Sequence, residues 1–324
     1  MTGQLDADLA APLRAAGVAD VRTGAPLAEL TTLRVGGPAA ALVVAERDED
    51  LAAVGAVCRE AGRPWLVVGR GSNLLVADAG WPGVAVVLGR GFRGIELHTT
   101  AEGGVAVLGG AEPLPTVAMR LADAGLAGAA WAAGVPGTVG GAVRMNAGAH
   151  GGQGADHLGV VDLVRLRSGS REQWPAAACG LSYRHSELPD DAVVVGATWQ
   201  LAAGDRDAIR AEVREVRDWR RVHQPINEPN CGSVFTNPPG DSAGRLVEAV
   251  GAKGLRVGGA EVSTRHANFI VTRSGATAAD VVALIVELRR RVEEATGIRL
   301  RPEVMVAGAD GDGVAPWQEL PGDG

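Results

Sequence analysis

The segment Asn227–Asp241, "NEPNCGSVFTNPPGD", holds two side chains that could do chemistry, Cys231 and Ser233. Its asparagine, proline and glycine content excludes a helix and favours a loop that fixes a side chain in place. No histidine occurs between His223 and His266, and no GxSxG elbow is present, so a serine nucleophile with a local base is not indicated. A serine hydroxyl can instead give its proton to a strongly basic carbanion or enolate, and we rank Ser233 above Cys231 for this role.

Two further candidates stand in short polar segments. "LSYRHSELPDD" places Arg184 beside Tyr183, the only tyrosine in the chain, and "IRLRPEVMVAG" places Glu303 after a proline. An arginine in a polar turn is most often a solvated charge, and so is a lone carboxylate near a chain end. Taken alone, neither residue indicates catalysis.

Two glycine-rich loops could bind phosphate groups. The first spans residues 69–73 after an apolar strand, and the second spans residues 134–141. Glycine allows positive φ and the close approach that lets several backbone N–H groups point at one phosphate, although each loop alone is equally compatible with an ordinary tight turn. The first loop precedes a strand-like "LLVAD" and lacks the acidic residue that a Rossmann fingerprint requires, and no GK[ST] occurs. A dinucleotide held by both loops would therefore bind in another way.

The periodicity of apolar residues predicts the elements that carry these loops. Helices are expected over 48–62, with Asp48 as N-cap, and over 115–124, 207–224, from about 242, and through 281–297. Strands are expected at 64–69, 74–78, 84–89, 160–168, 192–202 and 266–272, with a turn at 79–83. The order indicates an α+β chain with a boundary near residue 203, where a smaller helix-flanked unit begins, and with a disordered tail over 309–324.

The composition limits the class of protein. The chain has 324 residues, 46% of them hydrophobic, which is enough for two or three domains. A formal net charge of −7 argues against nucleic acid, and three cysteines without a CxxC pair indicate neither disulfides nor a metal site. No apolar run is long enough to span a membrane and no signal peptide is evident, so we expect a cytoplasmic protein without membrane partners.

The ordered set of motifs resembles one family. "TTLRVGGPA", "VVGRGSNLLVAD", "AGVPGTVGGAVRMNAGAHGG", "LSYRHSEL", "CGSVFTNPPGDSAGRLVEAVGAKGLRVGGAEVSTRHANFIV" and "RPEV" are similar to the bacterial UDP-N-acetylenolpyruvoylglucosamine reductases, also called UDP-N-acetylmuramate dehydrogenases. The resemblance covers about residues 25–308. The direct passage from "CGSVFTNPPG" into "SAGRLVEAVGAKG" resembles the shorter, type II form of the family.

The resemblance implies a fold and a reaction. It implies an N-terminal segment over 1–24, an FAD-binding domain of the vanillyl-alcohol-oxidase type over 25–203 with lobes at about 25–91 and 92–203, and an α+β substrate-binding domain over 204–308. It also implies that NADPH reduces FAD and that the flavin reduces UDP-N-acetylglucosamine enolpyruvate to UDP-N-acetylmuramate, in peptidoglycan precursor synthesis. Small molecules are then the expected partners.

The resemblance also implies roles for particular residues. Ser233 matches the family's proton donor, while Arg184 and Glu303 match the pair that stabilises the enolic form of the substrate carboxylate. The remaining matches fall into a cofactor set and a substrate set. The cofactor set is Gly69, Arg70, Gly71, Ser72, Asn73, Gly134, Pro136, Gly137, Thr138, Gly140 and Gly141, and the substrate set is Tyr183, Asn237 and Asn268. Glu261 and Arg265 depart from the glutamine and lysine common in the family.

Two other functions are compatible with part of this motif set. An FAD-dependent oxidase of the same superfamily would keep the glycine loops but has no reason to keep Ser233, Arg184 and Glu303 together. A catalytically silent nucleotide-binding protein would be expected to lose at least one of the three. Because all three are present, we favour the reductase.

Overall fold

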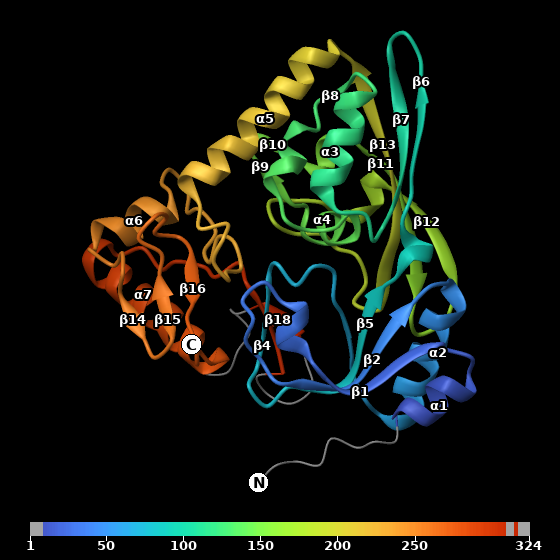
Figure 1. Ribbon diagram of the computed structural model, residues 1–324, viewed down its shortest axis with the longest axis horizontal. Helices are drawn as coiled ribbons and strands as arrows, with labels where there is room; N and C mark the ends of the chain where they lie inside the picture. The colour runs from blue at the N-terminus through green and yellow to red at the C-terminus, as the bar shows by residue number, and fades with distance from the viewer. Residues whose placement is uncertain (1–8, 309–313, 317–324) are drawn as a thin grey trace.

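The computed structural model describes residues 9–308 and 314–316. Figure 1 shows three bodies: a first lobe built on β2 and β5, a second lobe built on β11 and β13, and a C-terminal domain that contains α7. Within the described residues, none of the helices has the length and apolar character that crossing a bilayer requires.

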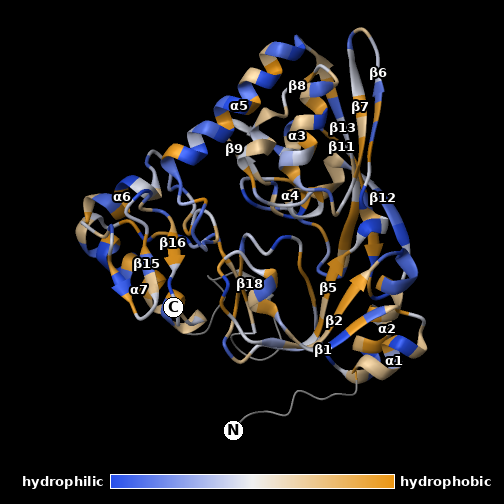
Figure 2. Cartoon of the chain, viewed as in Figure 1, coloured by the Kyte–Doolittle hydropathy of each residue, from blue (hydrophilic) through white to orange (hydrophobic). Residues whose placement is uncertain are grey.

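The first lobe is a mixed sheet flanked by helices. Its strands run in the order β1-β2-β5-β3, with β2 and β3 parallel to β5 and β1 antiparallel to β2. Figure 2 shows β2 and β5 coloured as hydrophobic, in keeping with their buried positions. The elements are α1 (Ala10–Ala15), β1 (Asp20–Pro26), η2 (Leu27–Leu30), β2 (Pro38–Ala45), α2 (Asp48–Ala61), β3 (Trp65–Val67), β4 (Leu74–Val76), β5 (Trp81–Leu88) and η3 (Arg90–Phe92).

Helix α2 follows from its sequence, with small corrections at the start. Leu51, Val54 and Cys58 are buried as the periodicity predicts, and Gly62 ends the helix at φ 61°. The N-cap is the residue before Asp48, and Asp48 is the first helical residue. The predicted turn at 79–83 is also shorter than expected, because β5 already begins at Trp81.

The second lobe is an antiparallel sheet in the order β12-β11-β13-β7-β6, with β8 paired to β13. Helix α5 lies along this lobe (Figure 1) and buries Ile209, Val213 and Val216 in the core shared with α3. This helix therefore packs with the second lobe although it follows the predicted boundary at residue 203, and the domain boundaries themselves stay predictions. The elements are β6 (Ile95–Thr99), β7 (Gly103–Gly109), α3 (Leu114–Asp123), β8 (Leu126–Ala127), η4 (Ala130–Gly134), α4 (Val139–Met145), β9 (Gly148–Ala149), β10 (Gly152–Gln153), η5 (Gly154–Asp156), β11 (Leu158–Arg165), β12 (Arg171–Pro175), η6 (Ala176–Cys179), β13 (Ala192–Ala203) and α5 (Arg206–His223).

The C-terminal domain packs two helices on a small antiparallel sheet, β14-β15-β16. Thr277 and Asp280 form a capping box at the start of α7, and Gly297 ends this helix at φ 71°. The elements are α6 (Ala243–Ala249), β14 (Arg256–Val257), β15 (Ala260–Val262), β16 (Ile270–Thr272), α7 (Ala278–Thr296), β17 (Met305–Ala307) and β18 (Val314–Pro316).

The C-terminal domain is joined to the first lobe by several contacts. Strand β17 pairs in parallel with β4, and the Asp78 carboxylate accepts hydrogen bonds from the Ala278 and Ala279 amides at 2.7 and 3.0 Å. Asp78 thus caps α7 from another part of the chain. The predicted tail over 309–324 lies largely outside the described residues, but it was wrong for Val314–Pro316, which form β18 beside β17.

Candidate active site

The two glycine loops predicted to bind the cofactor lie against each other. A Cβ atom added to Gly69 would lie 3.0 Å from Thr138 Oγ1, and one added to Gly137 would lie 3.9 Å from Ser72 Oγ. Gly71 has φ 60°, and a Cβ there would lie 2.1 Å from a backbone oxygen, so this position requires glycine. The tertiary structure therefore brings together two loops that are far apart in the sequence.

The backbone N–H groups of the loops differ in what they contact. Among the described residues, the amides of 69–73 and those of Gly137 and Thr138 have no hydrogen-bond acceptor. Gly140 donates to the Gly110 carbonyl at 2.8 Å, and Gly141 donates to Thr138 Oγ1 at 3.2 Å. The amides of Gly140 and Gly141 are thus already used within the protein, and the first loop has the larger number of N–H groups available for a phosphate.

Arg184 and Glu303 come together from the second lobe and the C-terminal domain. The Nε atom of Arg184 lies 3.1 Å from Glu303 Oε1, and its Nη2 atom donates to the Gly148 carbonyl at 2.6 Å. The two side chains are 21% and 17% exposed, so the pair is largely shielded from water. Arg184 has φ 56°, a conformation that a non-glycine residue adopts only when its surroundings impose it.

Desolvation dominates the electrostatics of the pair. Burial raises the pKa of Glu303, and the nearby Arg184 guanidinium lowers that pKa by a smaller amount. A carboxyl group with a raised pKa keeps its proton to higher pH than a solvated glutamate does. Glu303 can therefore act as a hydrogen-bond donor over a wider pH range than an exposed glutamate could.

The turn that carries Arg184 is held by residues that sequence reasoning missed. Arg144, at the end of α4, donates to the carbonyls of Leu188, Pro189 and Ala192 at 2.7, 2.8 and 3.1 Å. The Ser186 hydroxyl donates in return to the Arg144 carbonyl at 2.7 Å. The sequence held one signal for this role, because Arg144 is a charged residue in a stretch that is otherwise rich in glycine. The sequence does not show which backbone groups this arginine reaches.

Ser233 lies in an extended segment beside both Glu303 and the first glycine loop. The Glu303 amide donates to the carbonyl of the next residue, Val234, at 2.7 Å, and Phe235 forms a β-bridge with Pro302. On the other side, a Cβ added to Gly232, which precedes Ser233, would lie 4.0 Å from the Ser72 carbonyl oxygen. The Ser233 side chain is half-buried, and no described residue forms a hydrogen bond with its hydroxyl group.

Cys231 has a different environment from Ser233. Its side chain is buried, and desolvation, with a smaller contribution from Glu303, raises the pKa of the thiol to about 12. Since the thiolate is the reactive form of cysteine, this thiol is unreactive at neutral pH. The ranking of Ser233 above Cys231 stays a prediction, with which the buried thiol is consistent.

The residues predicted to contact substrate have unequal exposure. Tyr183 is 56% exposed, and the Arg184 Cζ atom lies 5.0 Å from the centre of its ring. Asn237 is exposed, but its side-chain oxygen accepts from the Ala243 amide at 3.0 Å. Asn268 is buried, and its side chain contacts the backbone of Phe235. Their proposed contacts with a substrate stay predictions.

The two departures from the family have structural roles. Glu261 is buried on β15 and forms ion pairs with Arg256 at 2.7 Å and Arg273 at 2.9 Å. Arg265 donates through Nη1 to the carbonyls of Arg221 and Gln224 at 3.1 and 3.5 Å. Both side chains therefore stabilise the protein itself.

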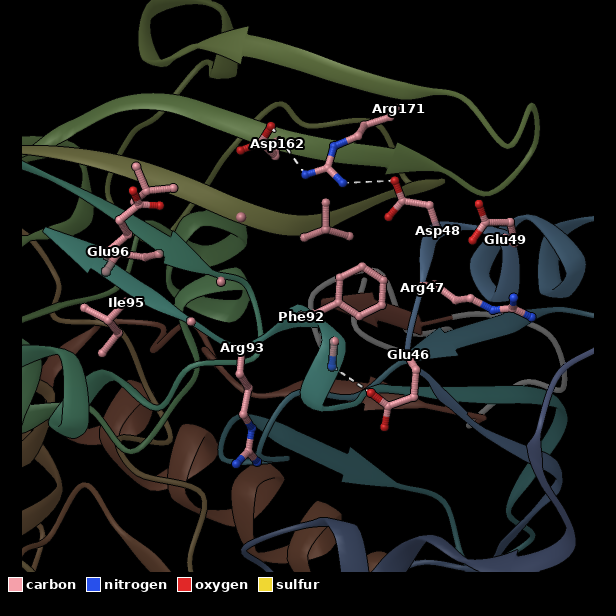
Figure 3. Close-up of a pocket in the computed structure, with 17 residues that line it drawn as sticks. Glu46, Arg47, Asp48, Glu49, Phe92, Arg93, Ile95, Glu96, Asp162 and Arg171 are labelled. Atoms are coloured by element: carbon pink, nitrogen blue, oxygen red, sulfur yellow. Dashed lines mark hydrogen bonds and ion pairs between the residues drawn. The ribbon is translucent and has the colours of Figure 1, made fainter.

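A groove of about 690 Å³ lies away from these residues, at the junction of the two lobes (Figure 3). Arg171 crosses it, pairing with Asp48 at 3.0 Å and with Asp162 at 3.7 Å, and the Glu46 carboxylate accepts from the Gly91 amide. Several of its charged groups are thus paired within the protein. None of the predicted site residues lines this groove, and the Arg184–Glu303 region stays the candidate site.

The fold and two family matches define a class of protein, a flavin-dependent oxidoreductase with a separate C-terminal domain. Residues 39–171 match the FAD binding domain family, and residues 224–307 match the family described as UDP-N-acetylenolpyruvoylglucosamine reductase, C-terminal domain. The predicted two-lobed α+β fold is confirmed.

Relatives identify the family. A UDP-N-acetylenolpyruvoylglucosamine reductase of Heliobacterium modesticaldum is 47% identical over 291 residues, which cover 88% of this chain and 90% of that protein. One from an Anaeromyxobacter strain is 44% identical and covers 95% of each chain. The crystal structure of a UDP-N-acetylenolpyruvylglucosamine reductase from Thermus caldophilus is similar with a TM-score of 0.74 at 36% identity, covering 89% of this chain and 98% of that chain. The chain belongs to the UDP-N-acetylenolpyruvoylglucosamine reductase family.

Proposed function

We propose that this protein reduces UDP-N-acetylglucosamine enolpyruvate to UDP-N-acetylmuramate with NADPH, in the synthesis of peptidoglycan precursors. One observation carries the proposal: the Arg184–Glu303 ion pair and the Ser233 segment, from distant parts of the chain, meet next to the predicted flavin loop. Their residue types suit the addition of a hydride and a proton across an enolpyruvyl double bond. Family membership supports the same reaction.

FAD would be held by the two glycine loops. The free amides of residues 69–73, together with those of Gly137 and Thr138, fit the oxygen atoms of a pyrophosphate. Glycine at 69 leaves the surface open, because a Cβ there would lie 3.0 Å from Thr138 Oγ1 on the opposite loop. When bound, FAD supplies the two-electron chemistry that takes a hydride equivalent from NADPH and delivers it to the vinyl carbon of the substrate.

Arg184 would bind the substrate carboxylate. Its guanidinium carries five N–H groups. Nη2 donates one of them to the Gly148 carbonyl, and Nε lies 3.1 Å from Glu303 Oε1, so the outer edge of the group can still meet a ligand. The planar group can meet a carboxylate with two parallel hydrogen bonds. These bonds strengthen as negative charge spreads onto the carboxylate during hydride addition, which lowers the barrier. When Glu303 is protonated, which its raised pKa favours, it would donate a further hydrogen bond to the enolate oxygen; when it is ionised, it pairs with Arg184.

Ser233 would complete the reaction. Hydride addition to the terminal vinyl carbon leaves the electron pair of the double bond on the carbon next to the carboxylate. That carbon takes a proton from the Ser233 hydroxyl, forming a C–H bond as the O–H bond breaks. A hydroxyl without a hydrogen-bond acceptor among the described residues is free to turn toward a bound ligand.

The test separates the two half-reactions by stopped-flow absorbance. Purified protein should be yellow, NADPH should bleach the flavin absorbance, and the enolpyruvyl substrate should restore it under anaerobic conditions. Ser233→Ala should keep the NADPH step and slow the substrate step by about 10²-fold or more. Reduced protein that only oxygen reoxidises would indicate an oxidase, and colourless protein that cannot take up FAD would refute the assignment to a flavin enzyme. Equal slowing of both half-reactions would remove the proton-donor role.

A further inference from the structure

Each of the three proposed catalytic groups lies within two residues of a backbone group that an asparagine side chain binds. Asn268 binds Phe235, Asn146 binds Ser182, and Asn73 binds Glu303 itself. We propose that Asn73, Asn146 and Asn268 are positioning residues that hold the backbone of Glu303, Arg184 and Ser233. The inference rests on the proposed function, and it gives Asn73 and Asn268 a different role from the direct cofactor and substrate contacts expected from the sequence.

Asn268 holds the segment of Ser233. Its side-chain oxygen accepts from the Phe235 amide at 3.0 Å, its side-chain nitrogen donates to the Phe235 carbonyl at 2.8 Å, and its own carbonyl accepts from the Val234 amide at 2.9 Å. The residue is only 4% exposed. Both ends of the amide group are therefore engaged by Phe235, and the bond to Val234 adds a third contact, so the backbone of the two residues that follow Ser233 is held in place.

Asn146 holds the turn of Arg184. It caps the C-terminus of α4 in the left-handed conformation, with φ 39°, and is 2% exposed. Its side-chain nitrogen donates to the Ser182 carbonyl at 2.8 Å, and its oxygen accepts from the Ala155 amide at 3.0 Å. Ser182 and His185 close the turn around Tyr183 and Arg184 with hydrogen bonds of 3.0 and 3.2 Å in the two directions. The side chain thus anchors the first residue of a turn whose backbone conformation is unfavourable at Arg184.

Asn73 holds Glu303. Its side-chain nitrogen donates to the Glu303 carbonyl at 3.1 Å, and its backbone carbonyl accepts from the Met305 amide at 3.0 Å. This side chain is turned toward the segment that carries Glu303, and the backbone N–H groups of the loop stay available for a phosphate. The first glycine loop and Glu303 are in this way fixed to each other.

The chemical reason for asparagine at these positions is its amide group. A side chain that offers both a donor and an acceptor can satisfy backbone groups that neither a helix nor a sheet pairs, and buried groups of this kind are costly to leave unpaired. Catalytic groups must also be held near a productive geometry, since a misplacement of about 1 Å can slow a reaction about 10²-fold. Neither an alanine nor a glycine can supply these bonds.

Double-mutant cycles test the three assignments in the flavin-loaded protein. Asn268→Ala, Asn146→Gly and Asn73→Ala should each slow the substrate half-reaction about 10- to 100-fold while flavin content and the NADPH step stay unchanged. Glycine is chosen at 146 because it keeps the positive φ. In double variants the same three changes are combined with Ser233→Ala, Arg184→Ala and Glu303→Ala respectively. In each double variant, the asparagine change should slow the substrate half-reaction less than about threefold beyond the single catalytic variant. Fully additive losses would overturn the proposal, as would loss of FAD in Asn73→Ala or weakened substrate binding without a slower step in Asn268→Ala.

Hydrogen exchange gives a second readout that does not depend on turnover. In the flavin-loaded variants, exchange should accelerate at residues 234–236, 182–185 and 303–305 respectively, and remain unchanged elsewhere. Asp50→Ala is the matched control, because it removes a buried side chain that accepts from the Glu46 amide at 2.9 Å at the start of α2, away from the three segments, and it should leave both half-reactions unchanged. Unchanged exchange at the three segments would overturn the proposal. Wild-type protein that binds FAD but is not reoxidised by the enolpyruvyl substrate would refute the proposed function, and exchange would then decide the positioning role by itself.

Discussion

Replacing Arg184 with lysine tests how the substrate carboxylate is bound. Lysine keeps the positive charge beside the buried Glu303, so the variant should fold. It changes only the number and the direction of the hydrogen bonds. An ammonium group has three N–H groups. If one N–H stays with Gly148 and one stays beside Glu303, a single N–H remains for a ligand, and it cannot form the two parallel bonds that a guanidinium edge can.

The size of the effect follows from that difference. A carboxylate held by two parallel charge-assisted bonds would lose one of them, and a hydrogen bond to a charged group contributes about 1.5–3 kcal/mol. At about 1.4 kcal/mol for each factor of ten, the substrate half-reaction should slow roughly 10- to 150-fold. The NADPH half-reaction should be unchanged, because Arg184 is assigned to the substrate carboxylate alone.

Stopped-flow absorbance of the flavin measures both steps in Arg184→Lys. Arg210→Lys is a matched control, since Arg210 forms an ion pair of 2.7 Å with Asp123 on the outer helices of the second lobe. The control should have wild-type rates in both half-reactions. If Arg184→Lys reoxidises at the wild-type rate, two parallel bonds to the carboxylate are not part of the mechanism, and the clamp is wrong.

Three other perturbations probe the structure around the site. Asp78→Ala removes two hydrogen bonds at the N-terminus of α7 and should lower the free energy of unfolding by about 1–3 kcal/mol in denaturant titrations. Asp78→Asn should cause a smaller loss. If Asp78→Ala causes no measurable loss, this cap is not needed for stability. The folded protein raises the pKa of Glu303 above its ordinary 4.5, so the native state binds this proton more tightly than the unfolded chain does. Wild-type stability should therefore fall as pH rises from about 4.5 through the raised pKa. Glu303→Gln should abolish this part of the slope of melting temperature against pH, and an unchanged slope would contradict the raised pKa. Since the pKa of Cys231 is raised to about 12, iodoacetamide at neutral pH should leave this residue unmodified in native protein and alkylate it after unfolding, and rapid native labelling would show an exposed thiolate.

Local features of the chain were predictable because they depend on near neighbours. The apolar spacing in α2 and α7 and the glycines that end these helices, Gly62 and Gly297, are readable from a few consecutive residues. Errors occurred where distant contacts decide. Trp81 begins a strand because it pairs with Ala39 on β2, and Val314–Pro316 form a strand because they pair with β17.

The sequence by itself determined the family, the loops and the candidate chemistry, because ordered motifs and residue types do not depend on how the chain is packed. Only the tertiary structure decided that Arg184 pairs with Glu303, that the two glycine loops touch, and that α5 packs with the second lobe. It also decided which way the asparagines face. An amide side chain can bind a ligand or a backbone group equally well, and the choice is made by whichever unpaired partner the packed chain brings within reach.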